Sequence, residues 1–208
     1  MRKLLISILL PLGLTLSAQV RLEKPELYLG ANFGMTGSRV LFNPSVDQSF
    51  LPGYNGGLVL RYITEKNVAM QIELNYSQRG WAESGGSYAR QLNYIELPFL
   101  THLYVGDKGR LFFNLGPKIS YLISEKVLYN LNSDATQEQH STLIQNPFDY
   151  GLCAGFGYLF RVQKQVFQLD TRANFSLSDV FSNDKRDYFD TSNNMNASVN
   201  LAWLFQLH

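Results

Sequence analysis

Hydrophobic and polar residues alternate along the segment from Val68 to Tyr76. Successive side chains of a β-strand point to opposite faces, so alternation of this kind gives a strand one apolar side and one polar side. The apolar side of this segment carries Val68, Met70, Ile72, Leu74 and Tyr76, and the other side carries Ala69, Gln71, Glu73 and Asn75. The same pattern recurs in most of the other strand candidates along the chain.

The recurrence predicts eight strands whose connections alternate between long and short. The strands cover residues 26–36, 54–63, 67–79, 90–104, 110–123, 148–161, 165–177 and 193–206. The long, polar connections are 37–53, 80–89, 124–147 and 178–192, and the tight ones are 64–67, 105–109 and 162–165. Long outer loops alternate with short periplasmic turns in this way in transmembrane barrels.

We therefore predict an all-β fold, an eight-stranded antiparallel up-and-down transmembrane β-barrel with its apolar face outward in lipid. No apolar stretch after residue 18 is long enough for a spanning helix, and only helices and closed barrels satisfy every backbone group in lipid. A soluble barrel would have no reason to turn its apolar face outward. The expected location is the outer membrane of a Gram-negative bacterium, with both termini in the periplasm because the strand number is even.

The first 18 residues have the layout of a signal peptide for export. Arg2 and Lys3 precede an apolar run from Leu4 to Leu16, and small residues then precede a cleavage position ahead of Gln19. The run is short for an N-terminal membrane anchor, which is the alternative interpretation. Residues 19–208 are then expected to form one barrel domain.

Composition excludes several classes of function. A net charge of +1 gives no indication of nucleic-acid binding, and the single cysteine, Cys153, excludes an internal disulfide framework and a cysteine metal cluster. The 12 tyrosines and 14 phenylalanines suit aromatic girdles at the two membrane interfaces.

Seven charged side chains fall on the polar, inward face of the predicted strands. An eight-stranded barrel is only wide enough for its own side chains, and charges held away from water need partners. We therefore predict a paired network across the lumen. It either plugs the barrel and holds it together or lines a narrow polar path or small-ligand pocket. Its members are Arg61, Glu73, Glu96, Lys118, Arg161, Asp170 and Arg172.

Five glycines share that inward face and are expected to leave room for the long arginine and lysine side chains. They are Gly57, Gly116, Gly151, Gly155 and Gly157.

The sequence predicts no catalytic residue, no cofactor and no metal ion. His102 faces inward, His140 lies in the longest loop beside Ser141 and in the same loop as Asp134, and His208 is the last residue. Such a loop cluster lacks the rigid support that catalytic geometry needs. There is no phosphate loop or metal-ligand spacing, and the acidic stretch 178–187 does not match a calcium-binding EF-hand loop.

Apolar side chains in the predicted outer loops are candidate contacts for a protein partner in a membrane complex. An aromatic girdle at the membrane interface is the alternative explanation. The side chains are Phe42, Phe50, Trp81, Tyr129 and Phe181.

Residues 91–100, QLNYIELPFL, and 113–122, FNLGPKISYL, resemble two consecutive strands of the PorT-like outer-membrane β-barrel family of Bacteroidota. Those family strands read Y-[LI]-E-[LI]-P and G-P-x-x-x-Y-L. Residues 75–80 are similar to the Y-x-Q-[KR]-G strand end of that family, and residues 170–177 are similar to its R-Y-x-x-G-L strand without the tyrosine and the glycine. The positions that carry the resemblance are Tyr94, Glu96, Pro98, Gly116 and Pro117.

The first motif has a physical consequence inside the predicted barrel. Tyr94, Glu96 and Pro98 share the inward face, and a proline removes one backbone donor from a closed sheet, which predicts a bulge at this point. Lys118 points inward on the neighbouring strand and is the leading candidate partner for Glu96.

The resemblance implies a barrel in the outer membrane, and its founding member is linked to cargo secretion through the type IX system. We expect a non-enzymatic structural or accessory protein that presents four outer loops to a partner. The alternatives are an accessory factor of type IX secretion, a narrow channel or small-ligand binder, and an outer-membrane hydrolase. Expected partners are outer-membrane lipid, lipopolysaccharide and, during assembly, the insertion machinery that reads a C-terminal aromatic pattern such as Trp203 and Phe205.

Overall fold

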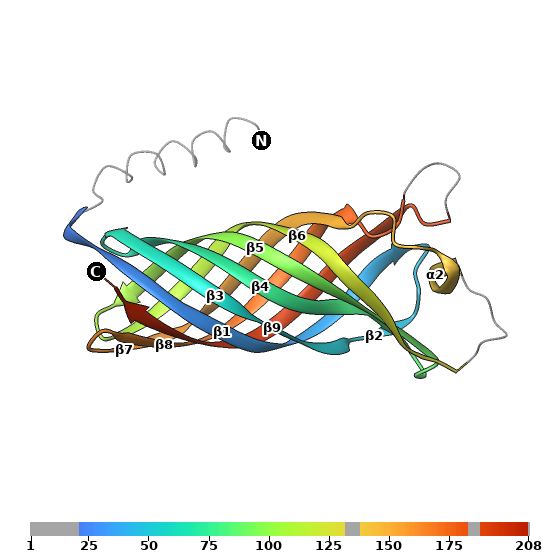
Figure 1. Cartoon of the computed structure of the whole chain (residues 1–208), viewed down its shortest axis with the longest axis horizontal. Coiled ribbons are helices and arrows are strands. Elements are labelled where there is room, and N and C mark those ends of the chain that lie inside the picture. Colours follow the sequence, from blue (N-terminus) through green and yellow to red (C-terminus); the bar gives the residue numbers. More distant parts are fainter. Residues whose placement is uncertain (1–20, 132–137, 183–187, 208) are drawn as a thin grey trace, which may run out of the picture.

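A computed structural model describes residues 21–131, 138–182 and 188–207 of the chain. Eight long antiparallel strands form a closed, tilted ring in which sequence neighbours pair and the last strand pairs with the first (Figure 1). This confirms the predicted eight-stranded barrel. The strands are β1 (Arg21–Asn43), β3 (Leu51–Glu65), β4 (Val68–Glu83), β5 (Tyr88–Gly106), β6 (Gly109–Asn130), β7 (Phe148–Val162), β8 (Gln165–Asp179) and β9 (Thr191–Gln206).

The two ends of the barrel differ. The tight turns at 66–67, 107–108 and 163–164 lie at the end where the described chain begins and finishes (Figure 1). By the rule that short turns face the periplasm, this is the periplasmic end. The opposite, outer end carries the short strand β2 (Gln48–Ser49), which pairs with β4, and the single-turn helix α2 (Glu138–Ser141).

The outward face of the barrel is apolar and the inward face is polar, as the alternation predicts. On β9, for example, the outward side chains of Leu201 and Trp203 are 63% and 49% exposed. The adjacent Asn200, which points inward, is 1% exposed. On β4, Met70 and Leu74 point outward in the same way. None of the helices in the described parts of the chain is long and apolar enough to cross a membrane.

Several strands run further outward than the sequence pattern predicts. β1 continues to Asn43, β4 to Glu83 and β6 to Asn130, so much of the predicted loops 37–53 and 80–89 is strand. Along the outer part of β6 the exposed side chains change from Tyr121 and Ile123 to the charged side chains of Glu125 and Lys126. The hydrocarbon layer therefore ends near this level, and the strand ends beyond it form a wall outside the membrane.

Arginine placed on the lipid face tests the orientation of the barrel. We expect Leu201→Arg to lower the free energy of unfolding by about 2–4 kcal/mol, because a charge near the bilayer midplane loses its hydration. Urea titration of the barrel in phospholipid vesicles, followed by tryptophan fluorescence, measures this change. Leu143→Arg is the matched control, since Leu143 lies in an outer connection and is 73% exposed. Equal effects of the two substitutions would contradict the assigned orientation.

Candidate functional site

The lumen is closed by apolar side chains near both ends. The periplasmic floor is a cluster of buried residues near the tight turns: Tyr28, Val59, Ile63, Ala69, Tyr104, Phe112, Leu159, Val166, Ala202 and Leu204. The outer plug is a second cluster inside the extended outer wall: Val40, Phe42, Trp81, Tyr88, Leu92, Tyr94, Val180, Phe181 and Phe189. Two groups of charged side chains lie between the floor and the plug.

The central charge cluster consists of Arg61, Glu73, Asp170 and Arg172, all buried. The guanidinium of Arg172 bridges the two carboxylates: Nη1 donates to Oε2 of Glu73 at 2.7 Å, and Nε donates to Oδ1 of Asp170 at 2.7 Å. Amide side chains donate further hydrogen bonds to the same carboxylates. Asn75, for example, donates to Oε2 of Glu73 at 2.8 Å. The structure therefore brings together four of the seven charged residues that the sequence places in the lumen.

Arg61 joins this cluster through amides rather than directly. Its Nε donates to Gln71 at 2.7 Å, and its Nη2 donates to Gln168. Gln71 in turn donates to Glu73, and Gln168 donates to Asp170 at 2.6 Å. The two glutamines thus relay the arginine to the carboxylates and leave few free groups for a ligand.

The outer charge cluster consists of Arg79, Glu96 and Asp149. Arg79 donates to Glu96 and, at 2.5 Å, to Asp149, and its guanidinium also lies 4.7 Å from the ring centre of Tyr94. Arg79 also donates to the hydroxyl of Ser120 at 3.0 Å, and Asp149 accepts from Ser176 at 3.0 Å and from Ser178 at 2.6 Å.

The predicted pairing of Glu96 with Lys118 is wrong. Arg79 holds Glu96 instead, because it reaches Glu96 from the adjacent strand β4. Lys118 is 1% exposed, and its Nζ has no hydrogen-bond partner among the described residues. The family-motif positions Tyr94 and Pro98 do lie on the inward side with Glu96.

The predicted bulge at Pro98 is also wrong. The registers of β5 with both neighbours are the same before and after Pro98. The irregularities in β5 lie nearer its outer end, between Ala89 and Arg90 and between Asn93 and Tyr94. The sheet therefore accommodates the missing proline donor without inserting a residue.

Arg161 does not belong to the lumen network. It lies at the periplasmic rim, partly exposed, where it pairs with Glu26 at 3.0 Å and donates to Gln206 at 2.8 Å. The sequence pattern gives the face of a strand correctly but not the depth of a residue along the barrel, and Arg161 is the last residue but one of β7.

The seven charged residues predicted for the lumen do not include Arg79 and Asp149, although both belong to the outer charge cluster. With them, the described lumen contains two cations and two carboxylates in the central cluster, and Arg79 and Lys118 against Glu96 and Asp149 further out. The central cluster is therefore formally neutral, and in the outer cluster Arg79 alone binds the two carboxylates. Continuing the alternation from Glu73 by steps of two residues reaches Arg79, which is the signal that identifies it.

The inward glycines serve close approach of strands more than side-chain space. At Gly155 a Cβ atom would lie 2.9 Å from Cγ of Arg172, so this glycine does make room for an arginine. At Gly116 it would lie 1.9 Å from the backbone oxygen of Phe99. Gly57, Gly151 and Gly157 likewise face the backbone of the next strand, and the prediction holds only for Gly155.

Three of the five aromatic side chains predicted as outer contacts are buried. Phe42, Trp81 and Phe181 are at most 7% exposed and pack together in the outer plug, with Phe42 and Trp81 edge-to-face at 5.4 Å. They point inward because the strands that carry them, or the connection in the case of Phe181, extend the barrel wall. Phe50 and Tyr129 are exposed.

His102 and His140 occupy structural positions. His102 is buried and lies 2.6 Å from Asn114 through its Nδ1. His140, on α2, stacks on Tyr88 at 3.7 Å between ring centres and contacts Glu83 at 2.6 Å through Nε2. In the described residues no three His, Cys, Asp or Glu side chains are grouped to hold a metal ion. Asp134 and His208 lie outside the described residues, as does the predicted signal peptide.

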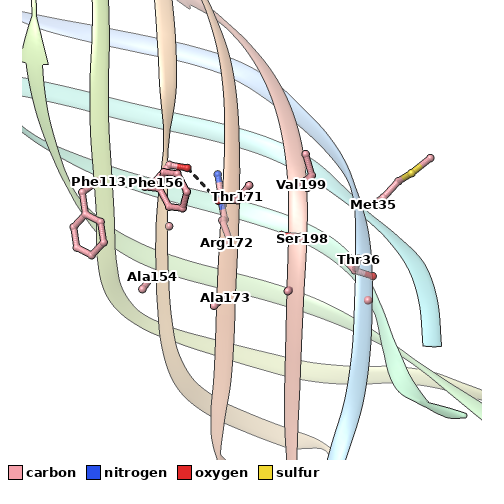
Figure 2. A pocket seen from close by; sticks show the side chains of 13 residues that line it. Met35, Thr36, Phe113, Ala154, Phe156, Thr171, Arg172, Ala173, Ser198 and Val199 are labelled. Atoms are coloured by element: carbon pink, nitrogen blue, oxygen red, sulfur yellow. Dashed lines mark hydrogen bonds between the residues drawn. The ribbon is translucent and has the colours of Figure 1, made fainter. Parts of the chain in front are cut away.

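An apolar depression lies on the outward face of the barrel wall, across β1 and β6–β9 (Figure 2). Small residues line its floor and larger apolar side chains, such as Phe113 and Phe156, stand at its sides. Thr171 bonds only to the backbone oxygen of Phe156 there, at 3.5 Å. The depression belongs to the lipid-facing surface, so membrane hydrocarbon covers it.

The comparisons with known proteins agree with this architecture. Residues 17–182 match the model of the family described as "Outer membrane protein beta-barrel domain". The crystal structure of Neisserial surface protein A is 10% identical, with a TM-score of 0.50, and the match covers 89% of this chain and 100% of that protein. No curated protein matches the chain significantly.

Two further barrels are similar at lower scores. Ail of Yersinia pestis is 12% identical over 86% of this chain and 98% of its own, with a TM-score of 0.43. Outer Membrane Protein W of E. coli is 13% identical over 89% and 99%, with a TM-score of 0.42. Identities this low describe the fold alone.

Removal of Arg172 tests the central charge cluster. We expect Arg172→Met to lower the free energy of unfolding by about 3–5 kcal/mol, because Glu73 and Asp170 then lose their shared guanidinium inside the barrel. Arg161→Met is the matched control. It breaks a partly exposed pair and is expected to cost about 0–1 kcal/mol. Urea unfolding in vesicles measures both, and equal costs would show that the cluster does not stabilise the barrel.

Lys118 gives a test of the opposite sign. Its ammonium group is buried without an acceptor, so Lys118→Met is expected to leave the free energy of unfolding unchanged or to raise it. The same change at Arg79 is expected to cost about 3–5 kcal/mol, since it leaves Glu96 and Asp149 unpaired. Comparison of the two midpoints of unfolding decides. A larger loss for Lys118→Met than for Arg79→Met would mean that the ammonium is the main partner of the two carboxylates.

Proposed function

Because this chain belongs to the outer membrane protein beta-barrel domain family, we propose that it is a non-enzymatic accessory barrel whose outer wall contacts a partner protein. The chain is an outer-membrane β-barrel of a Gram-negative bacterium. The observation that carries the proposal is the filled lumen: the floor, the two charge clusters and the outer plug use the inward side chains to bind one another. The surface that remains for recognition lies outside the membrane.

A narrow channel is a weaker alternative. A conducting path would have to pass Trp81 and Tyr94 in the outer plug, which are fully buried, and then Leu204 in the floor. The arginines between them are bonded to carboxylates or amides rather than aimed at an open passage. Opening such a path would require both apolar clusters to separate.

A role in type IX secretion is the second candidate. What favours it is the resemblance of the Tyr94–Pro98 and Gly116–Pro117 segments to the PorT-like family of Bacteroidota. We propose further that residues 1–18 are removed on export, that residues 19–208 are the mature barrel domain, and that lipopolysaccharide surrounds its outer leaflet. The insertion machinery would engage strand β9, which ends in the outward aromatic residues Trp203 and Phe205.

Crosslinking in living cells tests the proposed partner contact. The photoreactive residue p-benzoylphenylalanine replaces one exposed outer residue at a time, Phe50, Leu143 or Tyr188. We expect a discrete adduct of one size from at least one of these positions. Lys66 and Asp107, in the periplasmic turns, are the matched control positions. Adducts from the periplasmic positions alone, or none from the outer positions, would contradict the proposal.

Gene deletion separates the secretion role from a general accessory role. If the chain is a type IX factor, deletion of its gene makes type IX cargo accumulate in the periplasm. Returning the intact gene to the deletion strain restores export. Unchanged export after deletion excludes that role and leaves the proposed partner contact to the crosslinking experiment.

A further inference from the structure

Strand β6 extends further toward the outer end of the barrel than its neighbour β7. Its pairing with β5 continues to Asn130, opposite Tyr88, whereas its pairing with β7 stops at Tyr121, opposite Phe148. Beyond that point Leu122 still donates its backbone N–H to the oxygen of Pro147 at 2.8 Å. Within the described parts of the chain, no strand pairs with residues 123–130 on the side away from β5. Among the residues that the structure describes, this edge of the barrel wall is therefore unpaired.

The side chains of this segment are exposed on both faces. Every residue from 123 to 130 is exposed, while the outer ends of β4 and β5 keep buried residues on their inward side. Several of the exposed side chains belong to types that favour strands, including Ile123, Val127 and Tyr129. The outer end of β6 thus stands as a strand with a neighbour on one side only.

The segment is also ordered as a strand should be. Between two register shifts, residues 124–127 pair regularly with residues 93–90 of β5. Asn93 donates to Ser124 at 2.9 Å, and Arg90 donates to Glu125 at 2.6 Å and to the backbone oxygen of Thr142 at 2.8 Å. These bonds hold the edge in place, so a partner would not have to organise it.

We propose that this open edge of β6, residues 124–127 with the adjoining 129–130, binds an extended segment of another polypeptide by β-strand addition. Unpaired backbone groups of an edge strand are a template for a further strand, and main-chain hydrogen bonds supply the affinity in this mode of recognition. This inference rests on the proposed partner contact and specifies where the partner binds and in what conformation.

The edge also sets the chemistry of the partner segment. Cross-strand neighbours interact directly, so apolar or β-branched residues suit the positions opposite Val127 and Tyr129. Lys126 is exposed and forms no ion pair with a described residue, so an acidic residue suits the position opposite it. The regular ladder is short, which predicts weak binding that a larger contact would reinforce.

A second copy of the chain fits the edge less well. All copies enter the membrane in one orientation, so their β6 strands all run outward and could meet only as a parallel pair. Parallel pairing is slightly less stable per residue than antiparallel pairing. A flexible segment of another protein can run antiparallel to β6, toward the membrane, and we assign the edge to such a segment.

A synthetic peptide tests the edge directly. The probe is an eight-residue, dye-labelled peptide in which valine and threonine alternate around one central glutamate, and the protein is the full barrel in lipid nanodiscs. Two versions carry N-methyl groups on alternate amides, one version for each edge of the peptide. Glutamate on the side of Lys126 and valine on the side of Val127 favour one edge of the peptide for pairing with β6. One version should therefore bind about tenfold more weakly, having lost backbone hydrogen bonds, while the other binds like the parent.

Charge exchange locates the bound peptide. Lys126→Glu should weaken binding of the glutamate peptide, and a peptide with lysine in place of glutamate should bind this variant better than it binds the parent protein. Lys66→Glu, in a periplasmic turn, is the matched control and should change nothing. Slower hydrogen exchange of the backbone amides at 124–127 in the complex should accompany binding.

Three results would overturn the inference: no binding of the unmethylated peptide, equal binding of the two methylated versions, or binding that Lys126→Glu leaves unchanged. Any of them leaves the proposed partner contact standing if the outer positions Phe50, Leu143 or Tyr188 still form adducts in cells. Absence of the adducts with peptide binding intact would instead contradict the proposed partner contact, while the β6 edge would keep its ability to bind a strand.

Discussion

Backbone hydrogen bonding in hydrocarbon is the constraint on which this molecule depends. A peptide group without a partner in the membrane core costs several kilocalories per mole, so the strands must close on themselves. The pairing of β1 with β9 completes that closure over sixteen paired positions, from Tyr28 with Gln206 to Asn43 with Thr191. Closure then decides the rest: the outward face must be apolar, and the inward face must satisfy itself within a narrow lumen.

The lumen satisfies itself level by level. Apolar side chains fill the lumen at the floor and at the outer plug, and the charged side chains between them bind one another. Arg172 binds Glu73 and Asp170, and Arg79 binds Glu96 and Asp149. Since each guanidinium joins carboxylates from different strands, the clusters connect opposite parts of the wall. Such an interior fits a rigid structural barrel better than a channel. The surface available to bind a partner is then the part of the wall outside the membrane.

The sequence predicts the barrel because lipid enforces the alternation wherever a strand crosses the membrane. Strand facing and the inward position of Arg61, Glu73, Asp170 and Arg172 follow from a period of two residues, and the tight turns follow from the short gaps between the strands. Outside the hydrocarbon this enforcement ends. The extensions of β1, β4 and β6 are therefore not predictable from polarity, because a wall in water needs no apolar outward face.

Partner choice and depth are the features that alternation does not contain. The choice of Arg79 over Lys118 as the partner of Glu96 depends on which strands adjoin at one level. The burial of Phe42 and Trp81 depends on how far the wall extends. The same sequence around these residues would be compatible with an exposed loop, so the sequence alone does not reveal their burial. The expected bulge at Pro98 is missing because the ladder between β4 and β5 skips Pro98 and resumes at Glu96 in the same register.

Chemical access to Cys153 tests the sealed lumen most directly. This thiol is the only one in the chain, faces inward on β7 between the floor and the outer plug, and is 1% exposed. A small membrane-impermeant methanethiosulfonate reagent would be added to the folded barrel in vesicles, and labelling would be followed by mass. A sealed lumen leaves the thiol unlabelled until denaturant opens the barrel. Rapid labelling of the folded protein would contradict the sealed interior and restore the channel as the leading function.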